Sequence, residues 1–240
     1  MKRHLPNAIT CLNLLCGCLA LTFIFSTDAG PLRGLEIGAY LVGLAALADF
    51  ADGLVARALR VSSAIGKDLD SLADMVSFGV VPGAILMQLL QQATAGSSLP
   101  HWLPYVGFLV SIFSALRLAK FNNDTRQSDS FIGLPTPACT LVVASLPLIL
   151  THDRFHLSAV LLNPWLLLGL AGLLSGLLVA ELPLFALKFK SFGWAGNRRR
   201  FLFLALAVVL LLAWQAAAVP LVVLLYVLLS VPRRQARQGG

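Results

Sequence analysis

Long apolar stretches, separated by short polar segments, run through most of this chain. A helix needs roughly 20 apolar residues to cross about 30 Å of hydrocarbon, and eight stretches approach that length. They lie at about residues 8–27, 36–57, 70–94, 102–121, 134–151, 158–181, 200–214 and 217–232. The expected fold class is therefore all-α: one polytopic membrane bundle over residues 1–240 with about eight transmembrane helices, the last two (about 200–232) being short and peripheral.

Composition and charge agree with a membrane location. The chain is 58% hydrophobic and 12% charged, and its four cysteines lie in apolar stretches without the spacing of a zinc site. The net charge of +7 does not indicate a nucleic-acid partner, because Lys and Arg fall between the apolar blocks. With a cytoplasmic N-terminus, every basic residue except Arg33 and Arg154 lies on the cytoplasmic side. We therefore expect both termini in the cytoplasm.

Four aspartates fall where helical periodicity predicts membrane depth. Asp49 and Asp52 are three apart on one helix, and Asp70 and Asp74 are four apart on the next, so each helix presents two carboxylates on one face. Bare carboxylates in a low-dielectric bundle are costly, so they must be protonated, paired with bases or bound to cations. Oxygen ligands without His or Cys favour Mg²⁺ or Mn²⁺, and four of them could hold two ions that bridge a pyrophosphate.

A structural alternative is that these acids pair with Arg57, Arg60 and Lys67 only to hold two helices together. Intramembrane acids are usually functional, which argues against it. Small residues also remove bulk from the acidic faces, where a nucleotide or a neighbouring helix could approach the backbone: Gly53, Ala56 and Gly66.

The order and spacing of these residues resemble the signature of the CDP-alcohol phosphotransferase family. The chain reads Asp49-Phe-Ala-Asp52-Gly53-Leu-Val-Ala56-Arg57, then eight residues, then Gly66-Lys-Asp-Leu-Asp70-Ser-Leu-Ala-Asp74. The resemblance implies two divalent cations, Mg²⁺ or Mn²⁺, on the four aspartates, with Asp74 also acting as general base. It further implies that the CDP group is seated by Gly53, Ala56, Arg57 and Gly66.

Further segments resemble the branch of this family that makes phosphatidylserine. They lie at residues 5–17, 67–79, 115–122 and 131–138, and related branches share parts of them. The resemblance implies direct transfer of the phosphatidyl group from CDP-diacylglycerol to the hydroxyl of L-serine, with release of CMP. It also implies a homodimer in a bacterial-type inner membrane, in contact with membrane lipid, with the active site facing the cytoplasm.

Three cations are candidates for binding the carboxylate of a serine acceptor: Lys67, Arg117 and Lys120. Arg117 and Lys120 are three apart at the expected cytoplasmic end of a helix. Equally, they could anchor that helix or contact lipid head groups.

A polar stripe marks the first apolar stretch. Asn7, Thr10 and Asn13 recur at helical spacing, and we assign Asn7 and Thr10 to nucleotide binding. A plain polar contact between helices is the alternative.

Two rival functions remain open on sequence. The same machinery could serve glycerol 3-phosphate, inositol phosphate or choline as acceptor. An ion-coupled transporter would also place acids at membrane depth, but it would not need a small-residue face beside them. Release of CMP from CDP-diacylglycerol distinguishes the two classes.

Overall fold

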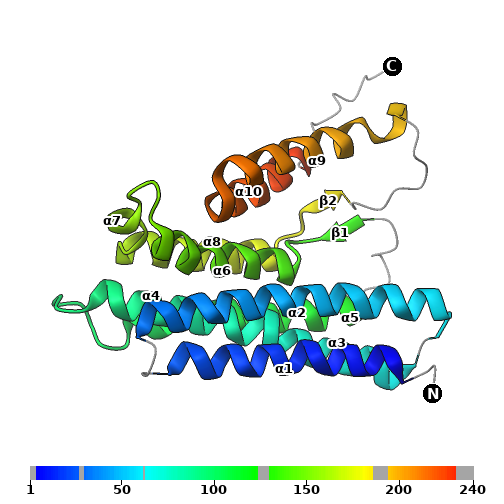
Figure 1. Ribbon diagram of the computed structural model, residues 1–240, viewed down its shortest axis with the longest axis horizontal. Helices are drawn as coiled ribbons and strands as arrows, with labels where there is room; N and C mark the ends of the chain where they lie inside the picture. The colour runs from blue at the N-terminus through cyan, green and yellow to red at the C-terminus, as the bar shows by residue number, and fades with distance from the viewer. Residues whose placement is uncertain (1–3, 27–29, 62, 124–129, 186–193, 231–240) are drawn as a thin grey trace.

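The computed structural model describes residues 4–26, 30–61, 63–123, 130–185 and 194–230, and most of them are helical (Figure 1). In chain order the helices are α1 (Leu5–Phe25), α2 (Pro31–Leu59), α3 (Ala64–Asp74), η1 (Met75–Val80), α4 (Val81–Thr94), η2 (Leu103–Phe108), α5 (Leu109–Asn123), α6 (Thr136–His152), α7 (Ser158–Leu161), α8 (Pro164–Val179), α9 (Trp194–Trp214), η3 (Gln215–Ala217) and α10 (Ala218–Ser230). The expected helical class is confirmed. One short antiparallel pair, β1 (Ser130–Ile132) with β2 (Pro183–Phe185), was not predicted.

Length and composition make this a helical membrane protein. Five described segments are long and apolar enough to cross a bilayer: Leu5–Phe25, Pro31–Leu59, Ala64–Thr94, Leu103–Asn123 and Arg200–Ser230. The apolar helices Thr136–His152 and Pro164–Val179 are shorter. Eight crossings and cytoplasmic termini stay predictions, and the predicted span ends at residues 27 and 232 lie outside the described residues.

The expectation of one helix over 158–181 is wrong. The structure divides this stretch into the four-residue α7 and the 16-residue α8. Asn163 caps α8, because its side-chain oxygen accepts hydrogen bonds from the N–H groups of Trp165 (2.9 Å) and Leu166 (3.4 Å). Pro164 occupies the first helical position, which suits a residue without an N–H.

The C-terminal helices α9 and α10 form a hairpin. The chain turns at η3, where Gln215 has a φ of 49°, and the rings of Phe203 and Tyr226 meet at a centroid distance of 5.7 Å. Phe203 lies near the middle of α9 and Tyr226 in the C-terminal half of α10, so the chain folds back and the two helices are antiparallel. Only 6% of an apolar stretch of this segment is buried, so little of the hairpin belongs to the buried interior.

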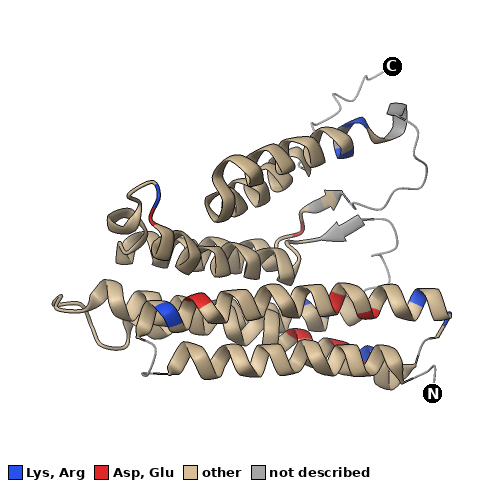
Figure 2. Ribbon diagram, viewed as in Figure 1, with Lys and Arg blue, Asp and Glu red and all other residues tan. Residues whose placement is uncertain are grey.

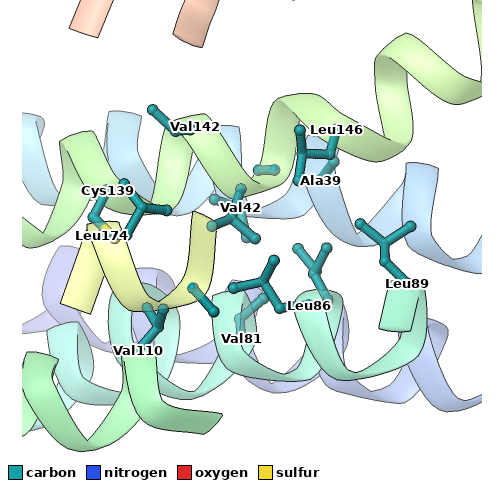
Figure 3. Packing of buried hydrophobic residues seen from close by; sticks show 14 of the residues in the cluster. Ala39, Val42, Val81, Leu86, Leu89, Val110, Cys139, Val142, Leu146 and Leu174 are labelled. Atoms are coloured by element: carbon teal, nitrogen blue, oxygen red, sulfur yellow. The ribbon is translucent and has the colours of Figure 1, made fainter. Parts of the chain in front are cut away.

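The apolar core joins helices from both halves of the chain (Figure 3). Its most buried members are at most 3% exposed and include Val42, Val81, Leu86, Val110, Cys139 and Leu174. Against this core α1 and α2 run side by side, and small residues bring them together. A Cβ on Gly38 of α2 would lie 2.7 Å from Cγ1 of Ile24, so a larger residue would force this buried side chain to move.

A π-helical turn, η1, follows directly after Asp74. The N–H of Val81 donates to the carbonyl of Val76, five residues earlier, instead of four. The wider turn shifts the helical register, and Ser77 donates to the carbonyl of Asn13 at 3.0 Å. Such turns occur most often at functional sites.

Hydroxyl groups from neighbouring helices hold this turn. Thr140 of α6 donates to the carbonyl of Phe78 at 2.9 Å, and Ser111 of α5 donates to the carbonyl of Gly79 at 2.8 Å. All four residues lie in the buried interior. The carbonyl groups of this irregular turn therefore accept hydrogen bonds from protein side chains, because no water is available to them inside a membrane.

Candidate active site

Three of the four signature aspartates meet between α2 and α3. Asp49 comes from α2, and Asp70 and Asp74 come from α3; one carboxylate oxygen of each lies within 4.8 Å of the others. All three are partly buried. Figure 2 shows acidic positions on these two helices close together along the bundle. The spacing of three and four residues thus brings the acids onto facing sides, as the sequence predicts.

Asp52 occupies a neighbouring position. It is 7% exposed, and its Oδ2 accepts a hydrogen bond of 2.6 Å from the hydroxyl of Thr10. Asp52 is close enough to Asp49 and Asp70 to interact with them electrostatically, but it is not a member of the three-acid cluster. Its role as a metal ligand stays a prediction.

Asn13 of α1 orients Asp74. Its side-chain N–H donates to Oδ1 of Asp74 at 3.2 Å, and the asparagine is fully buried. The contact places α1, the helix with the polar stripe, directly against the acidic cluster.

The cluster has the chemistry of a cation site. Within the described part of the chain, Oδ1 of Asp70 is buried without a hydrogen-bond partner, which in a native protein calls for a water or an ion. No described basic side chain forms an ion pair with the acids: Arg57 and Arg60 are exposed, and Nζ of Lys67 donates to the carbonyl of Asn122. Oxygen donors at this separation suit a hard divalent cation, so the three acids could hold a metal ion.

A cavity of about 270 Å³ adjoins the cluster, between the start of α1, the end of α2 and the start of α3. Asp52 and Asp70 form its acidic side. The other lining residues are Pro6, Asn7, Thr10, Gly53, Ala56, Val61, Ser63, Gly66 and Lys67. Five of the six residues predicted to bind the nucleotide therefore line one cavity. The sixth, Arg57, is exposed, and its Nη2 lies 4.0 Å from the position that a Cβ on Gly53 would take.

The N-terminus of α3 forms one wall of this cavity. Ser63 caps the helix, since its hydroxyl oxygen accepts a hydrogen bond of 3.0 Å from the N–H of Gly66. A Cβ on Gly66 would lie 2.9 Å from Oγ of Ser63 and 3.1 Å from Oδ1 of Asn7. A larger residue here would displace the side chains of Ser63 and Asn7, and the helix end beside Gly66 favours an anion.

The candidate acceptor-binding cations lie in three different settings. Lys67 lines the cavity, and Lys120 is exposed. Arg117 is 8% exposed and close enough to Asp74 to interact electrostatically. One of its Nη atoms donates to the hydroxyl of Thr136 at 3.4 Å, while its Nε has no partner among the described residues. Such burial does not suit an anchor at the lipid head groups.

Sequence reasoning did not assign roles to three polar residues that surround the site: Asn13, Ser63 and Asn122. Asn13 belonged to the polar stripe, and Ser63 stands at the N-cap position three residues before Gly66, so both carried a signal. Asn122 was part of the segment 115–122 that resembles the phosphatidylserine branch, but no role was assigned to it. It links α5 to α3 by donating to Oγ of Ser71 at 2.9 Å and by accepting from Lys67.

Residues 3–175, which contain both the acidic cluster and the cavity, match the family model described as CDP-alcohol phosphatidyltransferase. The chain belongs to this family, and the resemblance inferred from the aspartate signature is confirmed. The match ends before α9, so the α9–α10 hairpin lies outside it.

Similar proteins are named CDP-diacylglycerol–serine O-phosphatidyltransferase. The chain is 34% identical to the Bacillus subtilis (strain 168) protein over 139 residues, which are 56% of this chain and 70% of that protein. It is 33% identical to the Helicobacter pylori (strain J99) protein over 153 residues, 63% of this chain and 59% of the other. The Saccharomyces cerevisiae protein is 33% identical over 150 residues, 58% of this chain and 52% of that protein.

Proposed function

We propose that this chain transfers the phosphatidyl group of CDP-diacylglycerol to the hydroxyl of L-serine, forming phosphatidylserine and CMP. The cluster of Asp49, Asp70 and Asp74 beside the cavity carries the proposal, because it unites cation ligands with a nucleotide-sized space. Membership of the family supports the chemistry. The names of the similar bacterial and yeast proteins support serine as the acceptor.

Two divalent cations, Mg²⁺ or Mn²⁺, are the inferred cofactors. Asp49, Asp70 and Asp74 would hold one ion, and Asp52 would complete the ligands of a second. Such cations, when bound, neutralise negative charge on the pyrophosphate and on the departing CMP. The orphaned Oδ1 of Asp70 is the atom that most needs such a partner.

The cavity is the inferred seat of the CDP group. Gly53, Ala56 and Gly66 leave backbone accessible along its walls, and the N-terminus of α3 offers N–H groups to a phosphate. Asn7 and Thr10 add side-chain polar groups from α1. Arg57, which lies beside Gly53, would reach the nucleotide from the rim.

Asp74 is the inferred general base. Asn13 engages its Oδ1, so Oδ2 is the oxygen left to accept the proton of the serine hydroxyl. The serine oxygen then attacks the β-phosphorus, the bond from that phosphorus to the oxygen of CMP breaks, and the proton stays on Asp74. The reaction is a single displacement and needs no covalent enzyme intermediate.

Arg117 is the strongest candidate for the serine carboxylate. A buried guanidinium with an unpartnered Nε is well suited to a bidentate interaction with a carboxylate. Lys67 at the cavity wall is a second candidate. Lys120 is exposed on the same helix as Arg117, which supports a contact with solvent or head groups better than one with serine.

The proposed setting is a bacterial-type inner membrane, with both termini and the active site on the cytoplasmic side. Arg57, Arg60 and Lys67 near the cavity support this orientation through the positive-inside rule. We also propose that the chain is one domain and works as a homodimer, as the family resemblance implies. Light scattering of the detergent-purified protein tests the dimer.

An acceptor panel tests the function. Purified protein receives CDP-diacylglycerol and Mn²⁺ or Mg²⁺ with serine, glycerol 3-phosphate, inositol phosphate or choline in separate reactions, and CMP release is followed. We expect release only with serine. Release with another acceptor would refute the substrate, and no release with any acceptor would refute the enzymatic function.

A further inference from the structure

An apolar groove of about 750 Å³ lies between α6, α8 and the turn of the α9–α10 hairpin. Its walls include Leu146, Ile149, Gly169, Leu173, Trp214 and Pro220. The size is within the usual range for ligand pockets. The groove lies along the C-terminal part of α6, whereas Thr136 at the other end of that helix contacts Arg117 near the active site. The groove and the catalytic cavity share no lining residue, so they are separate sites.

A second, mostly apolar cavity of about 380 Å³ continues from this groove. Phe155 and Trp214 line both spaces, and their rings meet edge to face at a centroid distance of 6.4 Å. The second cavity adds His152, Arg154 and Gln215 to the wall. The apolar groove is thus continuous with an opening that carries the cationic side chain of Arg154.

We propose that this combined site binds a diacyl glycerophospholipid, with its acyl chains in the groove and its phosphate at Arg154. A groove among membrane helices is surrounded by lipid acyl chains, which can fill it. Trp side chains such as Trp214 prefer the level of the lipid head groups. Arg154 is exposed and forms no ion pair within the described part of the chain. The guanidinium is therefore available to a phosphate.

The titratable groups next to Arg154, Asp153 and His152, are engaged in local hydrogen bonds, so Arg154 is the group that would bind the phosphate. The carboxylate of Asp153 accepts a hydrogen bond of 3.2 Å from the N–H of Ser158, and so it caps α7. Nδ1 of His152 lies 3.0 Å from the carbonyl oxygen of Leu148, which makes Nδ1 the donor and leaves Nε2 for other contacts.

The bound lipid joins the hairpin to the rest of the protein. The α9–α10 segment lies outside the family match, and little of it is buried. A lipid between Leu146 or Gly169 on one side and Trp214 or Pro220 on the other covers apolar surface of both parts. The site is thus structural and does not depend on the proposed reaction.

Two glycines of α8 provide a matched test. An added Cβ would meet no atom within 4 Å at either Gly169 or Gly172, so each position accepts a larger side chain without a clash. Only Gly169 lines the groove. Gly169→Leu fills the proposed site, while Gly172→Leu makes the same change on the same helix outside it.

The measurement is native mass spectrometry of the purified protein, titrated with palmitoyl-oleoyl phosphatidylglycerol. We expect the wild type and Gly172→Leu to retain one phospholipid and Gly169→Leu to lose it. Arg154→Gln should weaken retention roughly tenfold, because a charge-assisted hydrogen bond is lost. Equal retention by the two glycine variants would overturn the site, and unchanged retention by Arg154→Gln would overturn the phosphate contact.

Discussion

The hydroxyl of Thr10 donates a hydrogen bond of 2.6 Å to Oδ2 of Asp52, a residue 42 positions further along the chain. Thr10 is 4% exposed and Asp52 is 7% exposed, so water does not replace this contact easily. The bond ties α1 to the helix that carries the first half of the aspartate signature. It also fixes the direction of the carboxylate at the wall of the cavity.

Thr10→Val keeps the shape of the side chain and removes the donor. The buried carboxylate of Asp52 then loses its side-chain hydrogen bond and keeps only the one from the backbone of Gly53, so we expect kcat/KM for CDP-diacylglycerol to fall roughly tenfold. Thr10→Ser retains a hydroxyl and should stay near the wild type. Steady-state CMP release measures both variants, and a full loss in Thr10→Ser would show that the methyl group, not the hydrogen bond, matters.

Asp70→Asn should weaken the binding of the divalent cation. Asp70 belongs to the three-acid cluster and has the orphaned oxygen, so its loss should raise the Mn²⁺ concentration for half-maximal activity by roughly 10- to 100-fold or more. Asp68→Asn is the control, because Asp68 lies on the same helix but is exposed and outside the cluster. Identical Mn²⁺ curves for the two variants would contradict the assignment.

Gly66→Ala should impair binding of CDP-diacylglycerol. The new Cβ presses on Oγ of Ser63 and Oδ1 of Asn7, and loss of the helix cap alone costs about 1 kcal/mol. Because Ser63 and Asn7 also line the cavity, we expect KM to rise about fivefold, which is a loss of about 1 kcal/mol in binding. Gly43→Ala on α2 meets no atom within 4 Å and should leave KM unchanged. An unaltered KM in Gly66→Ala would mean that this wall does not contact the nucleotide.

Arg117→Gln should act on the second substrate. If the guanidinium binds the serine carboxylate, the KM for serine rises roughly 10- to 100-fold, while the KM for CDP-diacylglycerol changes little. Lys120→Gln, an exposed position on the same helix, should leave both values unchanged. A change in the CDP-diacylglycerol KM alone would assign Arg117 to the nucleotide lipid.

Local spacing explains why much of the candidate site was predictable from sequence. Residues three and four apart share a helix face whatever surrounds the helix, so the pairs Asp49 and Asp52, and Asp70 and Asp74, could be placed from the sequence. The same rule put Asn7 and Thr10 on one side of α1, where both line the cavity. Long apolar stretches likewise predicted the helical membrane fold.

Contacts between distant segments were beyond such reasoning. Asn13 forms a hydrogen bond with Asp74, which is 61 positions away, and no local pattern in the sequence predicts this contact. The π-helical turn after Asp74 depends on hydroxyls from α5 and α6, so no local pattern predicts it. The break before α8 could have been predicted, because Asn163 followed by Pro164 is a helix-start signal. Dividing the sequence by the length of its apolar stretches ignores that signal.

The fate of labelled serine tests the central claim most directly. Wild-type protein and Asp74→Asn are incubated with CDP-diacylglycerol, ¹³C-serine and Mn²⁺, with and without EDTA, and the lipids are analysed by mass spectrometry. We predict ¹³C-phosphatidylserine in the wild-type reaction with Mn²⁺, and its loss with EDTA or in Asp74→Asn. Labelled phosphatidylserine that forms equally in EDTA, or none in the wild-type reaction with Mn²⁺, would contradict the account.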